Sequence, residues 1–254
     1  MLAVLLPAVA GVCFAHASGL DHEVGRRALP WLPPDLARQI VHHQREFTEG
    51  VDAARRWPRS FHQLGGARGM EGGIATQCER IRTALRQHVP FGDIVAALGA
   101  LAHLVADLNA PFPAGATTGD AAAFASYVPS ATPRIPLVFY GQDLTMIKGP
   151  ASGLARALLV RRQQQAWIAE VVHEDLFRVG GPDAWQRLDD RSSSFGAASV
   201  VTNHAATDFA NLAAWIWQHA GGLVPEIPAF DDTILVWKGE PQPREAPRTA
   251  VRVR

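Results

Sequence analysis

Two polar residues interrupt the most apolar stretch of the chain, which runs from Ile94 to Leu108. His103 and Asp107 are four residues apart, so on a helix they lie one turn apart on the same face. A helix that is apolar on every side is normally buried, and a buried imidazole or carboxylate costs free energy unless it is paired. The spacing leaves two interpretations open: a satisfied His–Asp pair in the core, or two ligands for Zn²⁺ or a similar ion.

The residues around this pair resemble a known signature. The segment AHLVADLNAPFP, with His103, Asp107 and Pro111, resembles the HxxxDxxxPxH signature of the zinc-dependent phospholipase C and single-strand-specific nuclease superfamily. Proteins of that family are all-α and secreted, and they hold up to three zinc ions between helices. Two further features are similar to the family: His22, shortly after the expected start of the mature chain, and a turn with Asp52 that is followed by a histidine.

The resemblance implies a set of metal ligands. One zinc site would use His62, His103 and Asp107, with Asp52 as a further ligand. A second site would use His22, the N-terminal backbone and a bridging Asp107. Asp52 or Asp107 would be the catalytic carboxylate that orients or deprotonates the attacking water.

The chain also departs from the family pattern. Pro113 stands where the signature has its last histidine, and Phe139 stands where the next motif has one, so we expect the third metal site to be missing. The N-terminal Trp of the family is absent. The separation of Asp52 from His62 is shorter than the family usually shows, which makes Asp21 a substitute ligand. These departures predict a divergent member with one or two zinc ions.

The function implied by the resemblance is that of an exported zinc-dependent phosphodiester hydrolase. Phospholipid is favoured over single-stranded nucleic acid as the substrate, and peripheral membrane contact is compatible with this. The 24 basic and 24 acidic residues give no net charge, which argues against a stable nucleic-acid complex. The alternatives are a non-catalytic descendant that serves as a binding or structural protein, and a plain helical protein whose resemblance is chance.

A second His–Asp pair, His204 and Asp208, repeats the four-residue spacing. Small residues surround it on a predicted helix. We expect a satisfied structural pair here, with a reserve set of ligands as the alternative.

Apolar residues at helical spacing predict an all-α, multi-helix bundle. The predicted helices, five to seven in all, include residues 35–47, 74–89, 94–108, 121–127, 154–179 and 195–220. Residues 50–73 are expected to be irregular and residues 133–140 extended. Asp93 is a candidate N-cap, and glycines at 180–181 and 221–222 are expected to end helices.

The two ends of the chain differ from its centre. Residues 1–17 resemble a secretory signal peptide without a basic n-region, which predicts a secreted or periplasmic protein. The alternative is a buried first strand or helix. Residues 18–228 are expected to form one domain, and the Pro- and Arg-rich residues 229–254 to be disordered. Cleavage would leave Cys78 alone, without a disulfide partner.

Overall fold

The computed structural model describes residues 20–63, 69–112, 116, 118–164, 167–225 and 235–237. In these ranges the chain is mostly helical, so the all-α prediction is confirmed. The α-helices there are α1 (Leu20–Ala28), α2 (Pro34–His42), α3 (Gln44–Ala54), α4 (Met70–Arg86), α5 (Phe91–Asn109), α6 (Gly119–Ala131), α7 (Leu144–Lys148), α8 (Ala151–Gln164), α9 (Ile168–Val179) and α10 (Ser193–His219). Short 3₁₀ turns include η1 (Leu29–Trp31), η2 (Arg59–His62), η4 (Thr132–Arg134) and η5 (Pro182–Arg187).

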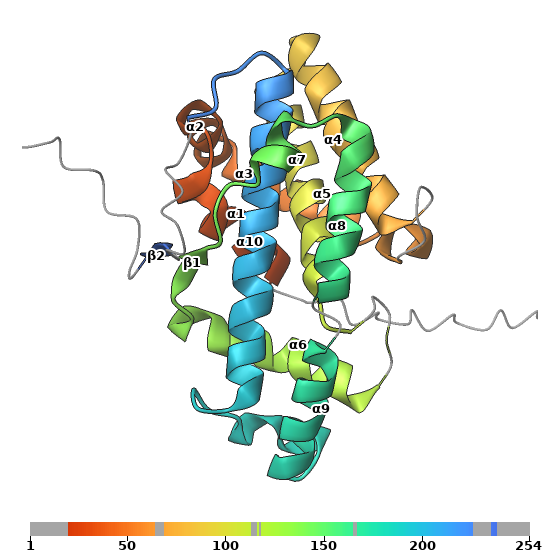
Figure 1. Ribbon diagram of the computed structural model, residues 1–254, viewed down its shortest axis with the longest axis vertical. Coiled ribbons are helices and arrows are strands. Elements are labelled where there is room, and N and C mark those ends of the chain that lie inside the picture. The colour runs from red at the N-terminus through yellow and green to blue at the C-terminus, as the bar shows by residue number, and fades with distance from the viewer. Residues whose placement is uncertain are drawn as a thin grey trace, which may run out of the picture.

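Two helices form the centre of the bundle. The long α10 runs through the middle of the molecule, and α5 packs beside it (Figure 1). Helices α1 and α3 cover one side of α5, while α4 packs against another. Helices α6 and α9 lie together at one end of the bundle (Figure 1). Helices α2 and α8 also contact α5, so the helix that carries the candidate ligands is surrounded by other helices.

Helix α5 is a core helix. Every residue from Leu98 to Asn109 is buried. Its Ala- and Leu-rich sequence favours a helix, Pro90 precedes its first turn, and Pro111 prevents its continuation. It is long and apolar enough to cross a membrane, but 72% of its most apolar window is buried inside the protein. The prediction that this apolar stretch is a buried helix is therefore confirmed.

Two glycines let α3 and α5 come unusually close. A Cβ atom at Gly50 would lie 1.9 Å from the carbonyl oxygen of Ala96, and one at Gly99 would lie 2.0 Å from the carbonyl oxygen of Phe47. No side chain fits in these places. We predicted residues 50–73 to be irregular because of their glycines, but residues 50–54 belong to α3 and residues 70–73 to α4. Gly50 serves helix packing.

Several predicted helix limits were wrong. The helix predicted over 35–47 is two helices that meet at His43, whose φ of −108° and ψ of 36° are not helical. The helix predicted over 154–179 is divided into α8 and α9. No proline or glycine marks either break, and these divisions help explain why the described ranges contain ten α-helices instead of five to seven. Asp93 does not cap α5: it lies inside the first turn, after Pro90.

Other local predictions are confirmed. Gly180 and Gly221 follow α9 and α10 with φ of 110° and 101°, the left-handed conformation that glycine tolerates. The segment expected to be extended contains strand β1 (Leu137–Phe139), which pairs antiparallel with β2 (Leu235–Trp237). Strand β2 lies within residues 229–254, for which we predicted disorder. The remaining residues of that segment, and residues 1–17, lie outside the described ranges.

Candidate metal centre

Three of the five predicted ligands meet in the interior of the bundle. His103 and Asp107 come from α5, and η2 brings His62 to them from a distant part of the sequence. His62 Nδ1 lies 2.7 Å from Asp107 Oδ2, and His103 Nε2 lies 3.3 Å from the same oxygen. The three residues are only 3%, 1% and 5% exposed, respectively. Buried polar groups this close together must share a proton, a hydrogen-bond network or a metal ion.

The donor set fits a divalent metal. One ligand atom from each of the three residues lies within 4.8 Å of the other two. Two ligands bound to one tetrahedral zinc ion at about 2.0–2.1 Å are ~3.3 Å apart. His103 Nε2 and Asp107 Oδ2 have this separation, whereas His62 Nδ1 and Asp107 Oδ2 lie at the shorter distance of a hydrogen bond. Two imidazoles and one carboxylate make up a protein ligand set known from catalytic zinc sites, where a fourth position stays open. The group can therefore hold a metal ion.

Asp21, on α1, is hydrogen-bonded to Nδ1 of His103, whereas Nε2 of the same ring lies near Asp107. Asp21 Oδ2 lies 2.9 Å from His103 Nδ1, and Arg55 donates two hydrogen bonds to the same carboxylate at 2.7 and 2.8 Å. Burial alone would raise the pKa of Asp21, but the hydrogen bonds from His103 and Arg55 outweigh it and hold that pKa well below its usual range. Asp21 is thus an anion that only accepts hydrogen bonds, and Nδ1 of His103 carries a proton.

His22 and Asp52 lie at the outer end of this network. His22 Nε2 is 3.5 Å from Asp52 Oδ1, and both side chains are partly exposed, at 34% and 45%. Arg55 Nη1 lies 3.2 Å from the same Asp52 oxygen. The structure therefore brings these two predicted ligands to each other and to Arg55, whereas the buried group of three consists of His62, His103 and Asp107.

The sequence interpretation missed Arg55. Its signal was its position three residues after Asp52, which places both on one face of α3. Its partner Asp21 is 34 residues away in the sequence and becomes visible only when α1 packs against α3.

Phe139 and Pro113 stand at the two positions where the resemblance led us to expect histidines. Phe139 is buried in β1, and its ring stacks on Trp31 with centroids 4.7 Å apart, so it is part of the hydrophobic core. Pro113 lies outside the described residues.

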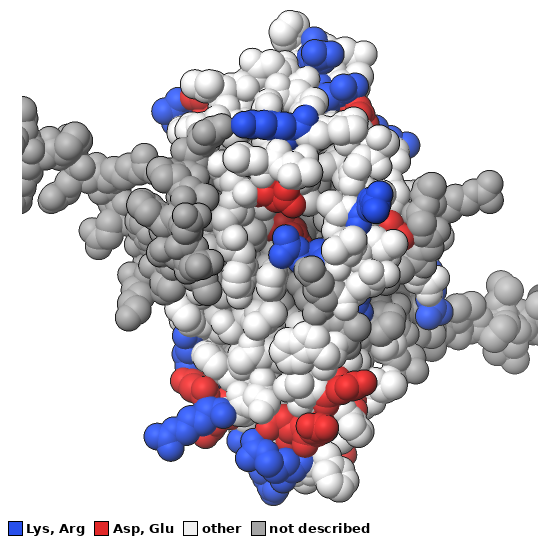
Figure 2. All heavy atoms as spheres, in the orientation of Figure 1, with Lys and Arg blue, Asp and Glu red and all other residues white. Residues whose placement is uncertain are grey.

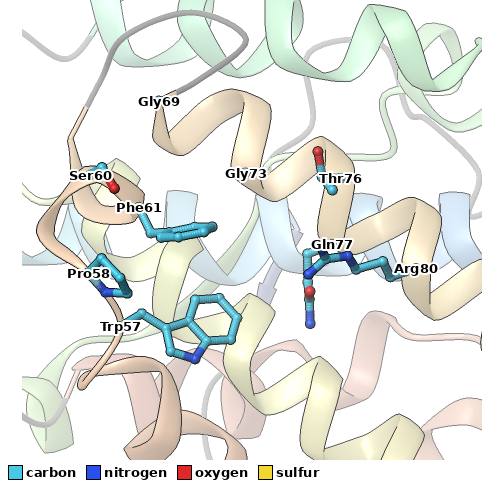
Figure 3. A pocket seen from close by; sticks show the side chains of 9 residues that line it. All are labelled: Trp57, Pro58, Ser60, Phe61, Gly69, Gly73, Thr76, Gln77 and Arg80. Atoms are coloured by element: carbon cyan, nitrogen blue, oxygen red, sulfur yellow. The ribbon is translucent and has the colours of Figure 1, made fainter.

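A cavity of about 460 Å³ opens next to η2. Trp57 and Phe61 form one wall, and Thr76, Gln77 and Arg80 on α4 face them (Figure 3). The two aromatic rings meet edge to face with centroids 5.6 Å apart. Phe61 directly precedes His62, so the same 3₁₀ turn supplies a wall of the cavity and a member of the buried group.

Comparison with known proteins assigns no family. No protein family matches the chain, and no curated protein is significantly similar to it. The fold and the site define it as a helical protein with a buried His–His–Asp group that can hold a metal ion.

Proposed function

We propose that this protein is an exported zinc-dependent phosphodiester hydrolase, a divergent relative of the phospholipase C and single-strand-specific nuclease superfamily. The observation that carries the proposal is the convergence of His62, His103 and Asp107 in the core. These are the residues that the family signature implied for one zinc site. Export rests on the sequence of residues 1–17 alone.

The three buried residues would bind the metal, and a zinc ion held there would supply Lewis-acid charge and would lower the pKa of a bound water molecule. Asp52 is the more accessible of the two candidate catalytic carboxylates, with 45% of its side chain exposed. It can accept a proton from the attacking water. Asp107 is buried and is the carboxylate that orients the reacting groups.

The cavity beside η2 supports a substrate with an apolar part. Its aromatic wall would contact an apolar group of the substrate, and Arg80 supplies a positive charge at the opposite side (Figure 3). Acidic and basic side chains are interspersed on the face seen in Figure 2, and no continuous basic stripe crosses it. Both features favour a phospholipid over single-stranded nucleic acid, and a peripheral membrane contact over a stable nucleic-acid complex.

Metal content and hydrolysis test this proposal together. Full-length protein purified without a metal-chelating tag is expected to contain at least one equivalent of zinc by elemental analysis. It should hydrolyse bis(p-nitrophenyl) phosphate, lose that activity with a chelator and regain it with Zn²⁺. Phosphatidylcholine vesicles and single-stranded DNA then compare the two substrate classes. Wild-type protein that neither contains nor binds zinc would overturn the proposal.

A second candidate function is that of a non-catalytic protein with a structural metal. The observation that favours it is the depth of the site, because all three ligands are at least 95% buried. In this case the chelated protein unfolds at a lower temperature and zinc restores the melting temperature, but neither phosphodiester substrate is hydrolysed. Activity that follows zinc content excludes this candidate.

A further inference from the structure

Arg55 and His22, the residue expected to bind a second metal ion, both lie near the same oxygen of Asp52. The second site was expected to use His22, the N-terminal backbone and a bridging Asp107, whereas Asp52 was a further ligand of the first site and Asp21 its substitute. In the structure the guanidinium of Arg55 lies between these two carboxylates. It donates to both oxygens of Asp21 and lies 3.2 Å from Asp52 Oδ1.

The carboxylate of Asp21 has no lone pair left for a metal. A carboxylate offers about four acceptor sites on its two oxygens. Asp21 accepts from Arg55 Nε, Arg55 Nη2, His103 Nδ1 and the backbone N–H of His22, at 2.7–3.0 Å. A metal ligated by Asp21 would have to displace one of these four donors.

The charge of Arg55 also opposes a second cation. A guanidinium stays protonated in proteins, and its hydrogen bonds with Asp21 raise its pKa further. It is partly buried, with 27% of its side chain exposed, so water screens its charge only in part. A divalent ion between Asp21 and Asp52 would lie beside this fixed positive charge.

We propose that Arg55 takes the place of the second metal ion, so that the centre binds one divalent metal at His62, His103 and Asp107. Asp21 is then an outer partner of His103 and a positioning residue. It accepts the proton of Nδ1, which leaves the lone pair of Nε2 directed to the side of Asp107. This inference rests on the proposed metal site, and it sets the number of ions that the site takes.

The stoichiometry of Zn²⁺ or Co²⁺ binding tests the inference. The metal-free full-length chain is titrated with each metal alone, by calorimetry and by the visible absorption of bound Co²⁺. Wild type is expected to bind one ion. Arg55→Ala frees Asp21, Asp52 and His22. The affinity of this variant for a second ion should therefore be at least tenfold higher than that of wild type. Arg56→Ala removes the same charge from the exposed neighbouring residue and should still bind one ion.

Two further variants keep the test decisive if Arg55→Ala does not fold. His22→Ala should still bind one ion with unchanged affinity, because His22 is not a ligand. Asp21→Asn should also bind one ion, but about 10–100-fold more weakly, as the loss of an outer partner predicts. Its Co²⁺ spectrum should shift as well.

The outcomes separate this inference from the proposed function. Two tightly bound ions in wild type, a folded Arg55→Ala that still binds one, or loss of the metal in His22→Ala would overturn the role of Arg55 and leave the metal site standing. Wild type that binds no metal overturns the proposed function itself.

Discussion

Two helices of this protein carry a histidine and an aspartate at the same four-residue spacing, yet the two pairs have different surroundings. On α5, His103 and Asp107 meet a second imidazole, His62. On α10, Asp208 lies 3.4 Å from the Nε atom of Arg161, and His204 Nδ1 lies 3.3 Å from another nitrogen of that guanidinium. The first pair therefore has a third potential metal ligand beside it, whereas the second pair has the positively charged Arg161.

Burial shifts the pKa values of both residues in the second pair. Burial, together with the charge of Arg161, lowers the pKa of His204 to about 4. Burial raises the pKa of Asp208 to about 6, although Arg161 and a hydrogen bond from Asn109 oppose this. The ring of Tyr140 stacks on His204 with centroids 4.1 Å apart. The pair on α10 thus has the surroundings of a structural pair, and spacing alone does not distinguish the two.

The largest expected difference between the pairs is in metal binding. His103→Ala removes one of three ligands, so it should weaken Zn²⁺ binding by more than about 100-fold, because even the loss of an outer partner costs 10–100-fold. His204→Ala removes the same side chain from α10 and should keep wild-type zinc content. Competition with a chromophoric chelator measures both affinities. Equal losses in the two variants would erase the proposed distinction.

The second largest difference between α5 and α10 is expected in how a substitution of glycine by alanine changes stability. Gly99→Ala places a methyl group 2.0 Å from the backbone oxygen of Phe47, so α3 and α5 must move apart. We expect the free energy of unfolding to fall by at least about 3 kcal/mol, the upper range for overpacking, and zinc affinity to fall with it.

Gly196 on α10 is the matched control for this substitution. Apart from its chain neighbours and the backbone of its own helix, no described atom lies within 4 Å of the position of its Cβ. Gly196→Ala should therefore raise the free energy of unfolding by about 0.5–1 kcal/mol, as alanine does in an exposed helix. Urea denaturation measures both variants. If Gly99→Ala were as stable as wild type, the close approach of α3 and α5 would not be required.

Sequence reasoning located the metal group because its main signal is local. An apolar helix with two polar residues on one face is visible in fifteen residues, and the family resemblance added His62. The partners that decide the chemistry are distant: Asp21 and Arg55 are 34 residues apart, and Arg161 and His204 are 43 apart. Only the packing of whole helices brings such pairs together.

Glycine misled the helix prediction for a physical reason. Between residues 50 and 73 glycines were interpreted as helix breakers, which is their usual role in exposed segments. At Gly50 the absence of a side chain is what allows α3 to contact the backbone of α5. Sequence alone does not tell a glycine that ends a helix from one that lets two helices touch.

The smallest expected effect is a pair of opposite pH dependences on α10. In the folded state Asp208 keeps its proton up to about pH 6, whereas its ordinary pKa is 3.8. Its contribution to stability is therefore present at low pH and lost as the pH rises from about 4 to 6. His204, with a pKa of about 4 in place of 6.5, contributes stability above pH 6.5 that is lost as the pH falls toward 4.

These two effects nearly cancel in wild type, so single variants should reveal each of them. In Asp208→Asn the His204 effect remains, and the free energy of unfolding relative to wild type should rise by about 2 kcal/mol between pH 4 and 7. In His204→Gln the Asp208 effect remains, and the same difference should fall by a similar amount. Urea denaturation at several pH values measures both slopes. Slopes of the same sign would mean that the two groups do not titrate independently, and the pair on α10 would then be a coupled polar site like the one on α5.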